Sequence, residues 1–324
     1  MSPKPLTETL LMDQTSYSNQ SQWEAIMANL PQSLQLSSDQ LPQEETWNWK
    51  GNGVHIDRYD TPNAKCKVIL HHGVGTNGRQ MTLLIGQRLS LHGYAVVAPD
   101  NLGYGVTKVT QSKVKFDDWV DLLSDLIDKE VEKDGLPVFL FGLSAGGMIS
   151  YHAAGKNKKV KGIVGLTFLD ERIKQVCKET VIHPLIAPLV PLVNALGNTP
   201  VINRIKIPMK WVSKMYTLTN DKKLLKNFLK DRTSSGALVS LEFLSSFMSY
   251  VPPVEAKDFD VCPILLAQPE DDRWTRELLS TLSLKNIKSE FTIKTLNNAG
   301  HYPIESPGRE QLETYFVEFL ERHL

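Results

Sequence analysis

The chain has 324 residues, and its 36 lysines and arginines balance 36 aspartates and glutamates. A balanced charge creates no long-range field that would attract nucleic acid, so we expect no nucleic-acid partner. The three cysteines, Cys66, Cys177 and Cys262, are far apart, which argues against a disulfide framework or a cysteine metal site and favours a reducing compartment. The N-terminus lacks a basic start followed by an apolar run, so we expect a cytoplasmic protein.

The first 45 residues are polar and are predicted to form an extension, residues 1–45, that wraps the main domain. One short helix is predicted around Trp23 to Leu30. From Thr46 the segments TWNWK and GVHIDRYD, with Gly and Asn between them, predict a β-hairpin.

After the hairpin, short apolar runs alternate with longer segments of helical periodicity, which predicts an α/β protein with a mostly parallel central sheet and helices on both faces. The clearest helix places Phe116, Trp119, Val120, Leu123, Ile127 and Val131 on one face. The predicted strands are Lys67 to His71, Tyr94 to Ala98, Pro137 to Phe141, and Val160 to Leu166.

Between residues 170 and 256 this alternation stops, and the segment is proline-rich and helix-like, with no clear buried strand. The alternation returns with a strand at Cys262 to Ala267, a strand near Glu290 to Leu296 and a final helix. We therefore predict a core of residues 46–169 and 257–324, interrupted by an insertion at 170–256. The apolar first half of the insertion, Ile182 to Leu196, either lines a pocket or forms the insertion's own core.

A basic stretch from Arg204 to Arg232 holds nine lysines and arginines against two aspartates, with Trp211, Met215 and Tyr216 among them. Such a run is most often a solvated helix face. Basic residues beside aromatic ones also suit transient contact with an anionic membrane surface, which gives this stretch a testable second interpretation.

The pentapeptide Gly142-Leu143-Ser144-Ala145-Gly146 lies between a predicted strand and a helix of small residues. In that context the glycines allow a tight turn, which exposes the serine hydroxyl above the sheet edge beside the next helix's N-terminus. The pattern therefore predicts a nucleophilic serine, Ser144. A glycine-rich turn with an incidental serine gives the same five letters, so the partners of the serine must decide.

A serine hydroxyl needs a base to remove its proton and a carboxylate to orient that base. Only two histidines follow the insertion; His323 is the penultimate residue, and His301 lies in a loop after a strand, so His301 is the predicted base. Three acids follow the strand at Cys262 to Ala267, and Glu270, Asp271 and Asp272 all qualify by residue type.

From about Thr46 onward the chain resembles the α/β-hydrolase superfamily, in particular monoacylglycerol lipase and lysophospholipase-like esterases. The resemblance rests on His72-Gly73, Pro99-Asp100-Asn-Leu-Gly103-Tyr-Gly105, Gly142 to Gly146, and Gly300-His301. It implies an α/β-hydrolase fold with a helical cap insertion. Pro269 replaces a glycine usual in the family's acid loop, so the resemblance assigns the acid to Asp272, with Asp271 as the fallback.

By the same resemblance, the backbone N–H groups of Val74 and Ala145 form the oxyanion hole. The implied activity is hydrolysis of a small-molecule carboxylic ester, with a lipid-like ester favoured, through an acyl-enzyme on Ser144, and no metal or organic cofactor is implied. Thioester, amide and carbon–carbon bond hydrolysis would use the same triad and remain alternatives. In the family the cap covers the catalytic face and selects the substrate.

Two further interpretations come from other classes of protein. Gly73-Val-Gly75-Thr-Asn-Gly78 after a strand, with Asp100 some way downstream, fits the dinucleotide fingerprint of an NAD(P)-binding oxidoreductase. That interpretation leaves Ser144 and His301 without a role. A non-catalytic binding protein on a hydrolase scaffold is the other alternative, because fold does not fix function.

Overall fold

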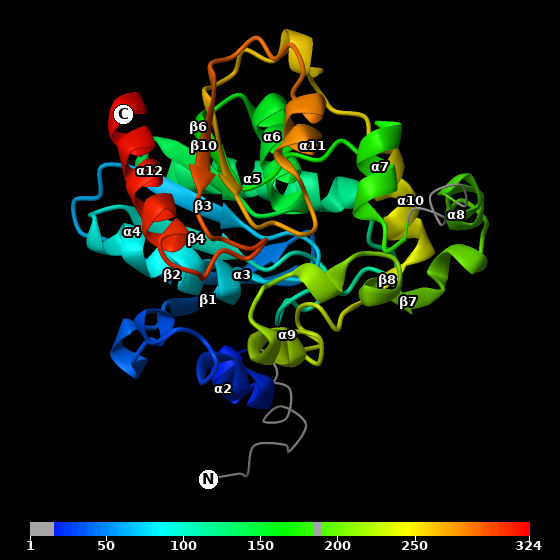
Figure 1. Ribbon diagram of the computed structural model, residues 1–324, viewed down its shortest axis with the longest axis horizontal. Helices are drawn as coiled ribbons and strands as arrows, with labels where there is room; N and C mark the ends of the chain where they lie inside the picture. Colours follow the sequence, from blue (N-terminus) through cyan, green and yellow to red (C-terminus); the bar gives the residue numbers. More distant parts are fainter. Residues whose placement is uncertain (1–15, 184–189) are drawn as a thin grey trace.

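The computed structural model describes residues 16–183 and 190–324 (Figure 1). The predicted features that fall in residues 1–15 and 184–189 therefore lie outside the described residues. At the centre is an eight-stranded sheet with the order β1-β2-β4-β3-β5-β6-β9-β10. Its strands are β1 (Gln43–Trp49), β2 (Asn52–Tyr59), β3 (Lys67–His71), β4 (Ala95–Pro99), β5 (Val138–Gly142), β6 (Val160–Gly165), β9 (Ile264–Pro269) and β10 (Phe291–Leu296).

The first strands form the predicted hairpin: β1 pairs antiparallel with β2, and β2 pairs antiparallel with β4. All pairings from β4 to β10 are parallel. The sheet is flanked by helices α3 (Gly78–Met81), α4 (Gln87–Leu91), α5 (Phe116–Asp134), α6 (Ala145–Asn157), α11 (Glu277–Ser283) and α12 (Gly308–His323). This arrangement confirms the predicted α/β-hydrolase fold.

The amphipathic pattern explains how α5 is placed. Phe116, Trp119, Val120, Leu123 and Ile127 are all buried, and α5 packs against α6. The helix ends where Gly135 adopts a left-handed conformation with φ of 73°, and its N–H donates to the Val131 carbonyl. Glycine is the residue that accepts this conformation most readily.

Between β6 and β9 the chain leaves the sheet. This segment contains α7 (Lys174–Thr180), α8 (Val190–Gly197), α9 (Lys222–Phe228) and α10 (Leu241–Ser249), together with the strands β7 (Lys206–Pro208) and β8 (Leu238–Ser240). β7 and β8 pair antiparallel and were not expected. Three residues are too few to show the alternation of polar and apolar side chains that identifies a strand.

The described part of the N-terminal segment packs on both the sheet and the insertion. It includes α2 (Ser21–Met27), near the predicted helix, and α2 contacts α9 (Figure 1). Asn227 of α9 donates a side-chain hydrogen bond of 3.0 Å to the carbonyl of Ala25. The Tyr17 hydroxyl donates to the buried carboxylate of Asp100 at 3.0 Å, so this segment also contacts the end of β4.

Among the described residues, none of the helices combines the length and the apolar character needed to cross a bilayer.

Candidate active site

Ser144 occupies a tight turn between β5 and α6. Its φ of 57° and ψ of −130° are unfavourable for a residue with a side chain, and such backbone strain is concentrated at functional sites. The flanking glycines make the turn possible. A Cβ at Gly142 would lie 2.3 Å from the Gly146 carbonyl oxygen, and one at Gly146 would lie 2.3 Å from the His71 carbonyl oxygen.

His301 and Asp272 lie together in a buried pair. The Asp272 Oδ2 accepts a hydrogen bond of 2.8 Å from His301 Nδ1. The carboxylate also accepts from the backbone N–H groups of Trp274 and Thr275 at 2.7 and 2.9 Å, and from the Thr275 hydroxyl at 2.6 Å. These contacts fix the imidazole with Nδ1 protonated, which leaves Nε2 to accept a proton.

Burial alone would raise the pKa of Asp272. The charge and hydrogen bond of His301, with the hydrogen bonds of Thr275, outweigh burial and hold that pKa below its ordinary value. Asp272 is therefore ionised at neutral pH and able to stabilise a positive charge on His301.

The two neighbouring acids make different contacts. Asp271 is exposed, and its backbone N–H donates to the Ala299 carbonyl at 2.9 Å. The Glu270 carboxylate accepts the N–H of Asn298 at 3.1 Å. Of the three acids, Asp272 is the one whose carboxylate contacts His301.

His301 Nε2 is buried and has no hydrogen-bond partner within residues 16–183 and 190–324. The structure therefore records no hydrogen bond between Ser144 and His301. Trp274 contacts His301, with ring centres 4.8 Å apart, and its side chain lines the same cavity as Ser144. Catalytic hydrogen bonds are often long without substrate and tighten in the complex.

Val74 and Ala145 both line this cavity, as an oxyanion hole requires. The turn at Gly73 packs directly on the serine: a Cβ there would lie 2.8 Å from the Ala145 backbone nitrogen and 3.0 Å from the Ser144 Cβ. Glycine at position 73 thus allows the backbone that precedes Val74 to approach the first turn of α6.

His72 holds this turn in place. Its Nδ1 lies 2.8 Å from the Gly73 carbonyl oxygen, and its Nε2 accepts the Asn101 backbone N–H at 2.9 Å. Both contacts are satisfied when Nδ1 carries the proton. Burial lowers the pKa of His72, which keeps the ring in this neutral form. In the sequence, His72 was identified only as part of the His72-Gly73 motif. Its role in holding the turn depends on the hydrogen bond from the Asn101 backbone, which the sequence does not show.

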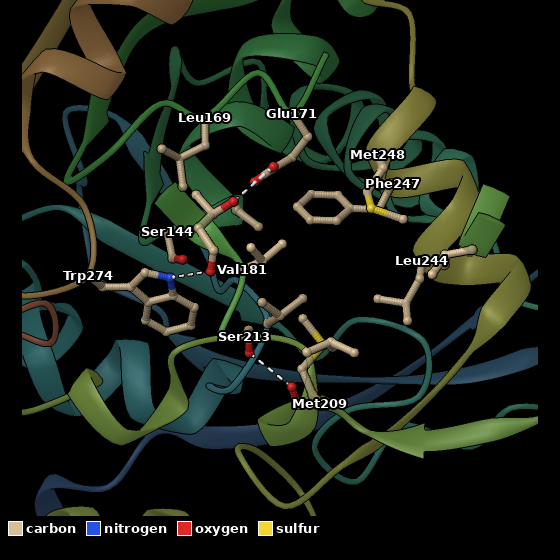
Figure 2. A pocket seen from close by; sticks show the side chains of 15 residues that line it. Ser144, Leu169, Glu171, Val181, Met209, Ser213, Leu244, Phe247, Met248 and Trp274 are labelled. Atoms are coloured by element: carbon tan, nitrogen blue, oxygen red, sulfur yellow. Dashed lines mark hydrogen bonds between the residues drawn. The ribbon is translucent and has the colours of Figure 1, made fainter. Parts of the chain in front are cut away.

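The cavity at Ser144 is mostly apolar (Figure 2). Trp274 lies on the Ser144 side, and Leu244, Phe247 and Met248 of α10 lie across from the serine. The other described residues that line it are Val74, Ala145, Leu169, Glu171, Thr180, Val181, Val193, Met209, Val212 and Ser213. Glu171 was not identified from the sequence, where it is one of several acids after β6.

The dinucleotide interpretation does not fit the structure. Asp100 is fully buried, and its carboxylate accepts from Tyr17, from the Gly78 N–H at 2.7 Å and from the Val106 N–H at 2.9 Å, so it cannot bind a ribose. A Cβ at Gly75 would lie 2.5 Å from the Met215 sulfur, so Met215 occupies the space that a pyrophosphate would need. The glycines and Asp100 serve the packing of the fold.

The chain belongs to the alpha/beta hydrolase family, whose model matches residues 68–313. It is 31% identical to a monoglyceride lipase of Saccharomyces cerevisiae over 144 residues, which are 41% of this chain and 46% of that protein. It is 33% identical to phospholipase YtpA of Bacillus subtilis over 121 residues, 36% of this chain and 42% of that protein. The matches thus span less than half the length of each relative.

Among solved structures, the fold is similar to that of a soluble variant of the monoglyceride lipase from Saccharomyces cerevisiae, crystallised with a substrate analogue. The TM-score is 0.72 at 20% identity, covering 91% of this chain and 98% of that one. This similarity shows the α/β-hydrolase fold, and the substrate is a separate question.

Proposed function

We propose that this protein is a serine hydrolase that cleaves carboxylic esters, with Ser144 as nucleophile, His301 as general base and Asp272 as the acid that orients it. The observation that carries the proposal is the buried Asp272–His301 hydrogen bond of 2.8 Å beside an apolar cavity that Ser144 lines. A strained serine at the start of α6 supports the same roles.

In the proposed reaction, the Ser144 hydroxyl attacks the ester carbonyl while His301 Nε2 takes its proton. The backbone N–H groups of Val74 and Ala145 stabilise the oxyanion. His301 then protonates the leaving alcohol, and a water molecule, activated in the same way, attacks the acyl-enzyme and releases the acid. Asp272 stays ionised throughout and stabilises the imidazolium.

We propose that residues 170–256 form a cap over the core of residues 46–169 and 257–324 and shape the substrate site. Side chains from this segment, including Val181, Val193, Met209 and Phe247, supply much of the cavity wall. An apolar wall favours an acyl chain, and a lipid-like monoacyl ester is our preferred substrate.

We also propose transient contact between this cap and an anionic membrane surface. Trp211 and Tyr216 are 64% and 53% exposed, and Lys210 and Lys214 precede them in the same stretch. Aromatic and basic side chains together are typical of interfacial contact.

The proposed function is tested by assaying p-nitrophenyl esters of increasing acyl length. We expect kcat/KM to rise from acetate toward medium chains, because each methylene buried in the cavity adds about 0.8 kcal/mol. A protein that is folded but hydrolyses none of these esters would contradict the proposal.

A further inference from the structure

An acidic side chain, that of Glu171, lies on the wall of the mostly apolar cavity at Ser144. Among the described residues that line it, Glu171 is the single ionisable group, and no lysine, arginine or histidine is present. Residues 184–189, which come shortly after the lining residue Val181 in the sequence, also have no ionisable side chain. Figure 2 shows Glu171 on the cavity wall above Ser144; Phe247 and Met248 line the same cavity.

The turn that carries Glu171 is anchored by its two neighbours. The Ile173 N–H donates to the Asp170 carbonyl at 3.0 Å, which closes the turn. Arg172 donates to the Asp170 carboxylate at 2.7 Å and to Glu255 at 2.8 and 2.9 Å. Arg172 therefore forms ion pairs with two other carboxylates. Glu171 has no ion-pair partner among the described residues.

Glu171 instead contacts the hydroxyl of Thr180, which lies 2.9 Å from its Oε2. The single proton of that hydroxyl has two other acceptors within reach, the carbonyls of Val176 at 3.1 Å and Cys177 at 3.2 Å. Thr180 thus has one proton for three acceptors, so its hydrogen bond compensates only partly for a charge on Glu171.

We propose that Glu171 makes this cavity selective against anionic substrates, so that the enzyme accepts esters whose bound part is uncharged, as in a monoacylglycerol, and rejects esters that bring a phosphate into the cavity. The inference rests on the proposed ester hydrolysis. A phosphate would enter an apolar space in which none of the described lining residues is a cation, and an ionised Glu171 would add direct repulsion.

The charge state of Glu171 depends on its surroundings. Burial, opposed by the hydrogen bond with Thr180 and reinforced by the charge of Asp170, raises its pKa to about 7. The Cys177 thiol of α7 also interacts with Glu171, and burial raises the pKa of that thiol to about 11, so it stays neutral. Glu171 therefore ionises near pH 7, and the repulsion it exerts is strongest above that pH.

The test compares kcat/KM for monodecanoylglycerol and for its phosphate monoester, at pH 6 and pH 8, in wild type and in Glu171→Gln. We expect Glu171→Gln to lower the preference for the neutral ester about tenfold at pH 8, the equivalent of about 1.4 kcal/mol of lost repulsion. At pH 6, where Glu171 is mostly protonated, variant and wild type should show nearly the same preference. Glu179→Gln is the matched control, because Glu179 pairs with Arg276 and does not line the cavity.

Thermal unfolding gives a second readout. Because folding raises the pKa of Glu171, the wild-type protein loses stability as pH rises from the ordinary glutamate range to about 7. The thermal midpoint of Glu171→Gln should therefore rise relative to that of the wild type between pH 5 and pH 8. An unchanged substrate preference at pH 8 in a folded Glu171→Gln would overturn the inference. Failure of wild type to hydrolyse monodecanoylglycerol at all would instead count against the proposed function.

Discussion

At the scale of single residues, the contacts of Asp272 separate it from the acids beside it. By residue type alone, Glu270, Asp271 and Asp272 were all candidates for the acid, because position in a loop does not reveal which side chain turns inward. In the structure Asp272 is buried against His301 and Thr275, and Asp271 is exposed. The position of Glu171 on the cavity wall was also not predictable from the sequence, because it depends on the ion pairs of its neighbours Asp170 and Arg172.

We expect Asp272→Asn to lose most of the esterase activity, because an asparagine can neither orient His301 in the same tautomer nor stabilise its positive charge. The loss should reach about 10⁴-fold in kcat if the aspartate acts as in serine proteases. Asp271→Asn is the matched control, one residue away with the same chemical change, and should keep near wild-type activity. The reverse order of the two variants would move the acid to Asp271.

At the scale of elements, the buried parallel strands were predictable and the short strands were not. β3 was predicted with its observed bounds, and β5 and β6 to within one residue, because central strands covered on both faces are continuous apolar runs. β7 and β8 were not predicted, because each has only three residues. The pairing of His301 with Asp272 was expected only from the resemblance to the α/β-hydrolase superfamily. The contact of His72 with the turn at Gly73 was not expected, because it depends on a backbone N–H that no motif shows.

The helix α9 offers a test of the proposed membrane contact. Lys222, Lys223 and Lys226 are exposed on it. Replacing all three by glutamine should weaken binding to anionic vesicles about a hundredfold at low salt, because each lysine near such a surface contributes about 1 kcal/mol. Turnover of a short soluble ester should not change.

A triple variant of lysines outside the cap, Lys158, Lys161 and Lys257 to glutamine, serves as the control. Vesicle sedimentation measures the binding. Wild-type protein that ignores anionic vesicles at low salt would contradict the membrane proposal.

At the scale of the whole molecule, a buried group of charges ties the N-terminal segment to the sheet. His55 lies 3.1 Å from Glu44, 3.6 Å from Asp57 and 3.2 Å from Asp100. Arg79 pairs with Asp57 and Glu44, and Tyr17 donates to Asp100. Burial alone would lower the pKa of His55, but its interactions with Asp100 and Glu44 raise that pKa to about 10.

This shift predicts how stability depends on pH. A histidine whose pKa is raised on folding stabilises the protein fully below about pH 6.5, its unfolded value, and loses that contribution as pH rises toward 10. We expect the thermal midpoint of the wild type to fall between pH 7 and pH 10, and His55→Gln to fall less over the same range. Equal slopes for the two proteins would show that His55 is not charged in the folded state.

Covalent labelling tests the proposed role of Ser144 as the nucleophile of an acyl-transfer reaction. A fluorophosphonate probe should label the wild type at Ser144 alone, as located by peptide mass spectrometry. Ser144→Ala should take up no label and retain less than about a thousandth of the esterase rate, since loss of a triad nucleophile costs about 10⁶-fold. Labelling at another residue, or a folded Ser144→Ala that keeps more than a tenth of the wild-type rate, would contradict the assignment of Ser144 as the nucleophile.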